Sequence, residues 1–154
     1  MTARPCLPRR AILLTLPWLL DGCGGAPPPP ATLTLDITAA ADQNPQADGS
    51  PAPVSVTLYQ LAAAGRFERA EVFALSEREA ATLGGDLLQS ERFVLAPGER
   101  RGLSRTLKPG AQFLGAAVLF RDIDRAQWRA VAPLAASGAS RLGLAIGRLS
   151  VRLS

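Results

Sequence analysis

Apolar and polar residues alternate along two short segments in the first half of the chain, residues 32–38 and 54–59. This period of two places the apolar side chains on one face of an extended strand. The apolar positions in these segments are Leu33, Leu35, Ile37, Val54, Val56 and Leu58. We therefore expect two β-strands here, each with one face turned toward a core.

From Arg92 onward, similar apolar segments are separated by turn signals such as Pro97-Gly98 and Lys108-Pro109-Gly110. Strands are predicted over residues 93–95, 101–107, 113–120, 127–131, 142–146 and 149–153. The parity of the apolar positions changes between the last two, which predicts a bulge or bend at Gly147. Seven or eight short strands with one small helix indicate an all-β fold, a two-sheet β-sandwich.

The single predicted helix begins at Ser76. Ser76 and Glu79 have the spacing of a capping box, and Gly84-Gly85 provides a stop. The helix is expected to be about two turns long, with Ala80 and Leu83 facing the body of the protein. Residues 87–88 are expected to extend this apolar cover after the turn.

The N-terminus has the order of a lipoprotein signal. Basic residues precede an apolar stretch over residues 11–20, and Gly22 lies directly before Cys23. A stretch of about ten residues is too short for a membrane-spanning helix, which needs roughly twenty. We expect residues 1–22 to be removed and Cys23 to carry the lipid that holds the protein on a membrane. A plain secretory signal with a chance cysteine is the alternative.

Residues 23–31 contain the lipidated Cys23, two glycines and four consecutive prolines, Pro27–Pro30. Proline-rich segments favour the extended polyproline II conformation, so this segment is predicted to be a tether that holds the domain roughly 20 Å from the lipid surface. The folded domain is expected to cover residues 32–154.

The charge of the mature chain is small. Removal of residues 1–22 takes away three arginines and one aspartate, which lowers the net charge from +4 to +2. The remaining arginines alternate with acidic residues, as in Glu77-Arg78-Glu79 and Arg121-Asp122, and this pattern is typical of a solvated surface. Nucleic acid is therefore not an expected partner.

Candidate catalytic chemistry is sparse. The chain has no histidine, and its two cysteines are Cys6, inside the signal, and Cys23. We expect no disulfide, no metal site, no cofactor and no catalytic residues, and thus no enzyme. Asp122 and Asp124 are interpreted as part of a solvated turn, and Trp128 as an aromatic residue of the core or of a sheet face.

The connection over residues 41–53 is too long for a tight hairpin. It has prolines at positions 45, 51 and 53, which limit its freedom in the unfolded chain and lower the entropy lost when a partner binds it. It has no large apolar residue, so it is not expected to fold back into the core. A recognition loop and a plain solvated loop both fit these properties.

A set of short motifs along the mature chain closely resembles the TssJ family, also called SciN or VasD. The motifs are Asn44-Pro45, Asp48-Gly49, residues 53–61, residues 67–75, residues 83–88, Pro97-Gly98-Glu99, Phe120-Arg121-Asp122 and Trp128-Arg129. Their order and spacing, together with the lipoprotein signal, make the resemblance specific. Members of this family are outer-membrane lipoproteins of the bacterial type VI secretion system.

The resemblance implies a transthyretin-like β-sandwich that faces the periplasm from the outer membrane. It also implies a partner, the periplasmic C-terminal domain of TssM, with TssL as a further component of the membrane complex. The loop between the first two strands is the family's contact with TssM. Here the candidate contact residues are Asp42, Gln43, Asn44, Pro45, Gln46, Asp48, Gly49, Ser50 and Pro51.

The function expected from these observations is that of a structural lipoprotein tying the secretion apparatus to the outer membrane, with no small-molecule substrate. The alternative is a transthyretin-like lipoprotein that binds a small ligand or peptide. A deep apolar cavity with converging polar groups would favour this alternative.

Overall fold

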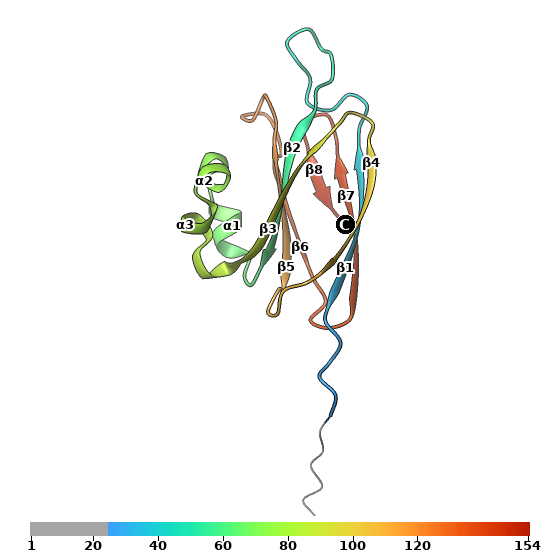
Figure 1. Cartoon of the computed structure of the whole chain (residues 1–154). Helices are drawn as coiled ribbons and strands as arrows, with labels where there is room; N and C mark the ends of the chain where they lie inside the picture. The colour runs from blue at the N-terminus through green and yellow to red at the C-terminus, as the bar shows by residue number, and fades with distance from the viewer. Residues whose placement is uncertain (1–24) are drawn as a thin grey trace, which may run out of the picture.

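The computed structural model describes residues 25–154, which form two four-stranded sheets packed face to face, with three short α-helices on one side (Figure 1). The strands are β1 (Thr32–Ala39), β2 (Val54–Leu61), β3 (Leu87–Leu95), β4 (Arg100–Thr106), β5 (Phe113–Leu119), β6 (Arg129–Pro133), β7 (Ala139–Ile146) and β8 (Val151–Leu153). The predicted β-sandwich is confirmed.

The first sheet has the strand order β4-β1-β7-β8. Its central strand β1 is antiparallel to β4 and parallel to β7, so that Leu35 lies opposite Leu103 on one side and Leu142 on the other. The predicted alternation holds in β1, because Leu33, Leu35 and Ile37 are at most 3% exposed. These side chains form one half of the core between the sheets.

The second sheet has the order β3-β2-β5-β6 and is antiparallel throughout. Strand β2 is buried along nearly its whole length, on both faces. Val54, Val56 and Leu58 belong to the core between the sheets, whereas Tyr59 and Leu61 belong to a second apolar cluster under the helices. The simple one-sided alternation expected for this strand is therefore incomplete, because the helices cover its outer face.

The helical layer consists of α1 (Gly65–Arg69), α2 (Val72–Glu77), α3 (Glu79–Leu83) and a 3-10 turn, η1 (Gly84–Asp86). It contributes Phe67, Leu75 and Leu83, each at most 1% exposed, to the second cluster. The Phe67 ring lies 5.4 Å from that of Tyr59, in a tilted arrangement. A Cβ atom at Gly115 of β5 would lie only 3.0 Å from Phe67, so glycine permits this close packing of α1 on the sheet.

The prediction of one helix capped by Ser76 is wrong. Ser76 lies near the end of α2, and its hydroxyl donates a hydrogen bond to the Phe73 carbonyl oxygen at 3.1 Å. The Glu79 carboxylate accepts from the Ser90 hydroxyl at 2.7 Å and does not cap a helix. Burial of Val72 and Leu75 fixes an earlier helix instead, which shows that tertiary packing overrides the local capping signal.

Two further local predictions hold only in part. Residues 87–88 begin β3, where Leu87 packs against the second apolar cluster and Leu88 against the core between the sheets. At Gly147 the chain bends and has no bulge: the Gly147 N–H donates to the Ser150 carbonyl oxygen at 2.8 Å in a turn between the antiparallel strands β7 and β8. The chain reverses direction there, and the reversal accounts for the change in the parity of the apolar positions.

The two ends of the sandwich differ. Residues 25–31 lead away from one end, and the connection between β1 and β2 protrudes from the opposite end (Figure 1). Strand β1 has eight residues, which span roughly 26 Å at about 3.3 Å per residue, and it joins these two ends directly. Among the described residues, every helix is too short to cross a membrane.

Candidate functional site

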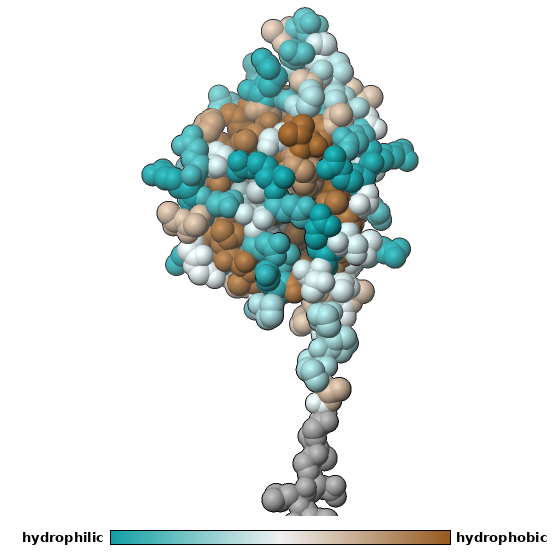
Figure 2. Space-filling model, viewed as in Figure 1, coloured by the Kyte–Doolittle hydropathy of each residue, from teal (hydrophilic) through white to brown (hydrophobic). Residues whose placement is uncertain are grey.

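The loop between β1 and β2, residues 41–53, is the most prominent projection of the domain (Figure 1), and Figure 2 shows that its surface is mostly hydrophilic. Residues 46–49, at its tip, are exposed. By contrast, Gln43 is fully buried and Asn44 is 3% exposed. The expectation that the loop does not return to the core therefore holds for the tip and is wrong for the root.

Asn44 joins the two arms of the loop and connects the loop to two other parts of the chain. Its Nδ2 group donates to the Pro53 carbonyl oxygen at 2.8 Å, and its Oδ1 atom accepts from the Arg121 backbone N–H at 2.7 Å. Its own backbone N–H donates to the Arg148 carbonyl oxygen at 2.9 Å. Asn44 has a φ of 47°, in the left-handed region that asparagine tolerates better than most residues.

Gln43 closes the neck of the loop from the inside. Its Nε2 group donates to the carbonyl oxygens of Leu95, at 2.8 Å, and of Ala52, at 3.3 Å. The Ala52 N–H in turn donates to the Gln43 carbonyl oxygen at 3.2 Å. Because buried polar groups are costly without partners, these bonds hold the two arms of the loop together at the level of the sheets.

The exposed tip has its own hydrogen bonds. The Gln46 N–H donates to the Ser50 carbonyl oxygen at 2.8 Å, and the Gly49 N–H, at a φ of 82°, donates to the Gln46 carbonyl oxygen at 2.9 Å. Asp48 accepts from the Ser50 hydroxyl at 2.6 Å and from the Ser50 N–H at 3.0 Å. These two bonds from Ser50 lower the pKa of the Asp48 carboxyl below its usual value.

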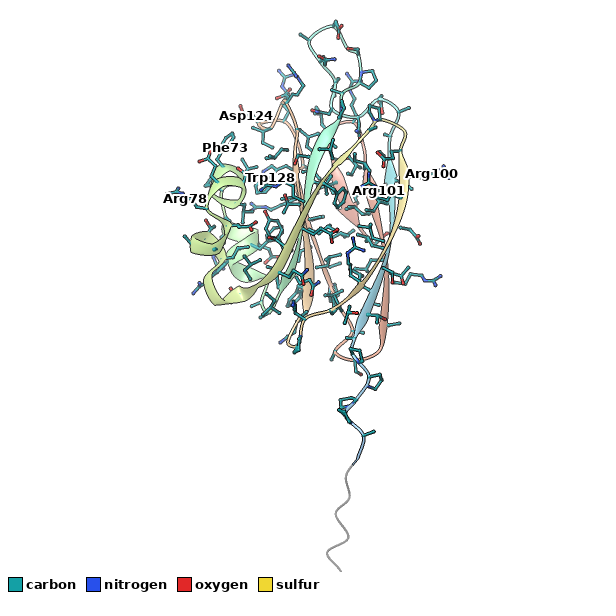
Figure 3. All side chains as sticks on the ribbon, viewed as in Figure 1. Phe73, Arg78, Arg100, Arg101, Asp124 and Trp128 are labelled. Carbon is teal, nitrogen blue, oxygen red and sulfur yellow. The ribbon has the colours of Figure 1, made fainter. Side chains whose placement is uncertain are left out.

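A groove of about 600 Å³ lies between the loop and the two neighbouring turns. The loop contributes Pro45 and Gln46, the connection between β5 and β6 contributes Arg121, Asp122 and Arg125, and the turn between β7 and β8 contributes Arg148. Three segments far apart in the sequence thus form one concave surface. Figure 3 places Asp124, from the same β5–β6 connection, at this end of the molecule.

Two of the groove arginines form only loose ion pairs. Arg125 lies 3.7 Å from Asp122, and Arg148 lies 3.8 Å from Asp42, with all four side chains at least 42% exposed. Exposed pairs of this kind contribute little to stability. Arg121 is also exposed, and in the described part of the chain it has no ion pair within 4.0 Å.

The candidate contact residues thus fall into two groups. Gln43 and Asn44 lie inside the neck, where their side chains bond to other parts of the domain. The remaining candidates are exposed or half-buried and accessible to a partner: Asp42, Pro45, Gln46, Asp48, Gly49, Ser50 and Pro51. The lipidation predicted at Cys23 falls outside the described residues. The grouping of Arg121, Arg125 and Arg148 was missed, since only the fold brings these arginines together.

Two other titratable groups with shifted pKa values, Glu91 and Tyr59, have structural contacts. The Arg105 guanidinium donates two bonds to Glu91, at 2.6 and 2.9 Å, across the open side of the sandwich and lowers the pKa of that carboxyl. Burial raises the pKa of the Tyr59 hydroxyl. Over residues 25–154, no group of three or more His, Cys, Asp or Glu side chains could hold a metal ion.

The regions weighed as alternative sites have structural contacts. Trp128 is half-buried and packs against both apolar clusters, with the Arg129 guanidinium 4.7 Å from its ring centre. The space between the two sheets beside Leu33, Leu58 and Leu114 is only about 20 Å³, room for about one water molecule. This interior space is far smaller than a typical ligand pocket of 300–1,000 Å³.

Fold and site together define a small β-sandwich domain with a helical cover and a firmly held exposed loop. The family model described as "T6SS-SciN: Type VI secretion lipoprotein, VasD, EvfM, TssJ, VC_A0113" matches residues 31–149. The chain belongs to this family of type VI secretion lipoproteins. Among curated proteins, none matches the sequence.

Solved structures support the same assignment. The type VI lipoprotein TssJ1 from Pseudomonas aeruginosa is 37% identical, with a TM-score of 0.79 over 82% of this chain and 96% of that chain. Lip from Serratia marcescens, described as a membrane-bound component of the type VI secretion system, is 24% identical and shares the fold, with a TM-score of 0.74 over 81% and 96% of the two chains.

Another similar chain belongs to a structure described as the type VI secretion protein TssM C-terminal domain (869–1107) from EAEC. It is 28% identical to this chain, with a TM-score of 0.68 over 80% of this chain and 97% of that chain.

Proposed function

We propose that this chain is the outer-membrane lipoprotein of a type VI secretion membrane complex and that its β1–β2 loop binds the periplasmic domain of TssM. In this proposal residues 1–22 are a cleaved signal, Cys23 carries the lipid, residues 23–31 are the tether, and residues 32–154 are the binding domain. The protein then ties the inner-membrane part of the apparatus to the outer membrane and faces the periplasm.

The positions of the tether and the loop support this arrangement. Residues 25–31 leave the sandwich at the end opposite the loop (Figure 1). A lipid at Cys23 would therefore hold the first end near the membrane, and the loop would point away from it into the periplasm. A partner that reaches across the periplasm would meet the loop first.

The similar structures support a TssM partner. The match to the structure described as the TssM C-terminal domain covers 80% of this 154-residue chain, which is about 123 residues. Because this is 97% of the matched chain, the matched chain is only slightly longer than about 123 residues. The TssM segment in the description, 869–1107, is about twice as long. We infer that the matched chain is a lipoprotein that accompanies the TssM domain. A further similar chain, 29% identical with a TM-score of 0.70, belongs to a structure described as a type VI membrane complex.

The single observation that carries the proposal is the hydrogen-bonded neck beneath an exposed tip. A loop that is already held in one conformation loses less entropy on binding than a mobile one. The buried side chains of Gln43 and Asn44 hold the base of the loop, and residues 45–51, which are exposed or half-buried, project from it.

The anchor is tested by Cys23→Ser. We expect this variant to be a soluble, folded periplasmic protein, whereas the unmodified protein fractionates with the outer membrane. Retention of the Ser variant in the outer-membrane fraction would refute the anchor at Cys23. The partner is tested by titration calorimetry of the Cys23→Ser protein with the purified periplasmic domain of TssM from the same bacterium, and the absence of binding would refute it.

A further inference from the structure

We infer that the partner-binding surface extends beyond the loop into the groove beside it, and that the groove binds an acidic segment of the partner, with Arg121 as the central contact. This inference rests on the proposed function and specifies the chemistry of the partner surface. It concerns residues 121–125 and 148, which lie far from the loop in the sequence.

The loop and the groove form one continuous surface. Asn44 bonds to the Arg121 N–H and to the Arg148 carbonyl oxygen, so the loop, the β5–β6 connection and the β7–β8 turn are held together by one buried side chain and its backbone. Pro45 and Gln46, next to Asn44 in the loop, line the same groove. A partner that contacts the exposed loop therefore lies directly over the groove.

The groove carries a net positive charge. Three arginines and one aspartate line it, Arg121, Arg125, Arg148 and Asp122. The Asp122 and Asp42 carboxylates lie 3.7 and 3.8 Å from Arg125 and Arg148, longer than the 2.7–2.9 Å typical of a charge-assisted hydrogen bond. Each of these arginines can still donate to another carboxylate.

Arg121 is placed to make the strongest contact. Its backbone is fixed, because its N–H donates to Asn44 at 2.7 Å, whereas its side chain is exposed and lines the groove. A guanidinium whose backbone is fixed loses less freedom when it forms a bidentate pair with a carboxylate. The size of the groove, about 600 Å³, is sufficient for several side chains of a partner.

The experiment measures binding of the periplasmic domain of TssM to the soluble Cys23→Ser protein by calorimetry, with thermal unfolding as the folding control. We expect Arg121→Glu to weaken binding at least tenfold, about 1.4 kcal/mol. Arg121→Lys should lose less, because it keeps the charge and loses the bidentate geometry. A higher salt concentration should weaken the binding of the unmodified protein to the TssM domain more than it weakens the binding of the Arg121→Glu protein.

The matched control is Arg141→Glu. Arg141 is an exposed arginine of β7, opposite Thr34 of β1 in the first sheet, and does not line the groove. Arg141→Glu changes the net charge by the same amount as Arg121→Glu and should alter the affinity for the TssM domain less than twofold. An equal loss of affinity in both variants would reduce the effect to overall charge and refute the groove site.

Failure of this inference is distinguishable from failure of the proposed function. If Arg121→Glu and the double variant with Arg125→Glu bind as tightly as the unmodified protein while a loop replacement abolishes binding, the loop is the interface and the groove is not part of it. If the unmodified protein does not bind the TssM domain at all, the proposed function itself is wrong.

Discussion

Two segments of this protein are rich in proline and lie outside the regular secondary structure, yet they differ in how they are held. Residues 25–30 are exposed, and the first backbone hydrogen bond after them is at Ala31, whose carbonyl oxygen accepts from the Leu107 N–H at 2.8 Å. The loop over residues 41–53 is also exposed at its tip, but its neck is buried and hydrogen-bonded.

The difference lies in two amide side chains. The described tail contains only glycine, alanine and proline before the first strand, and none of these has a polar side chain. The loop has Gln43 and Asn44, whose side chains make four hydrogen bonds to backbone groups of the domain. Proline restricts both segments, but only the loop has groups that fix its position, so one segment suits a spacer and the other a binding surface.

Among the changes that test this difference between the tail and the loop, loss of the Asn44 hydrogen bonds should have the largest effect on stability and affinity. We expect Asn44→Gly to leave the Arg121 N–H and the Pro53 carbonyl oxygen without their partner, which costs about 2 kcal/mol of unfolding free energy. Partner affinity should fall at least tenfold, because the loop and the groove lose their alignment. Denaturant unfolding and calorimetry measure the two quantities.

Asn44→Ala separates the hydrogen bonds from the backbone conformation. Both substitutions remove the same side-chain bonds, but alanine is strained at a φ of 47° and glycine is not. The unfolding free energy of the Asn44→Ala protein should therefore be about 1 kcal/mol lower than that of the Asn44→Gly protein. An Asn44→Gly protein as stable as the unmodified one would show that the neck is not held by this residue.

A smaller effect is expected at the tip. Ser50→Ala removes the hydroxyl that donates to Asp48, the largest cause of the lowered Asp48 pKa, so this pKa should rise toward its usual value. In the unmodified protein the pKa of Asp48 is lower in the folded state than in the unfolded state. The Asp48 carboxylate therefore stabilises the fold at pH values above its unfolded-state pKa. This stabilisation is lost as the pH falls through its folded-state pKa.

Carboxyl chemical shifts followed by NMR across the acidic range measure the pKa of Asp48 directly. The affinity for the partner at neutral pH should fall by only about twofold, because the backbone bonds at Gln46 and Gly49 remain. An Asp48 pKa that is the same in both proteins would contradict the hydrogen-bonded tip.

The smallest effect is expected in the tail. Replacement of Pro27–Pro30 by glycine and serine should change the unfolding free energy by less than about 0.5 kcal/mol, because these residues are exposed and make no contact that packs against the core. Affinity measured in solution should also stay the same. A clear loss of stability would mean that the tail is part of the folded domain.

The sequence predicted the sandwich well because its strongest signal is the alternation of apolar and polar positions. In β1 this alternation corresponds to burial, with Leu33, Leu35 and Ile37 inside. The helices were predicted poorly because they are five or six residues long and are held by packing of Phe67, Leu75 and Leu83 on the sheet. Such long-range contacts leave no local pattern, and the capping signal at Ser76 was misleading.

The same limit applies to the candidate site. The length and composition of the loop identified it as a projection, but its buried root depends on Leu95, Arg121 and Arg148, which are distant in the sequence. Polar residues such as Gln43 and Asn44 are normally read as exposed. Their burial follows from hydrogen bonds to backbone groups that only the assembled fold brings near them.

We propose that the exposed part of the loop binds TssM. The most direct test replaces Pro45–Pro51 by a glycine and serine segment of equal length in the Cys23→Ser protein and keeps Gln43, Asn44 and Ala52, which hold the neck. We predict a loss of stability of no more than about 2 kcal/mol, mainly from the two prolines, and an affinity for the periplasmic domain of TssM at least tenfold weaker by calorimetry. Unchanged affinity in a folded variant would contradict the claim.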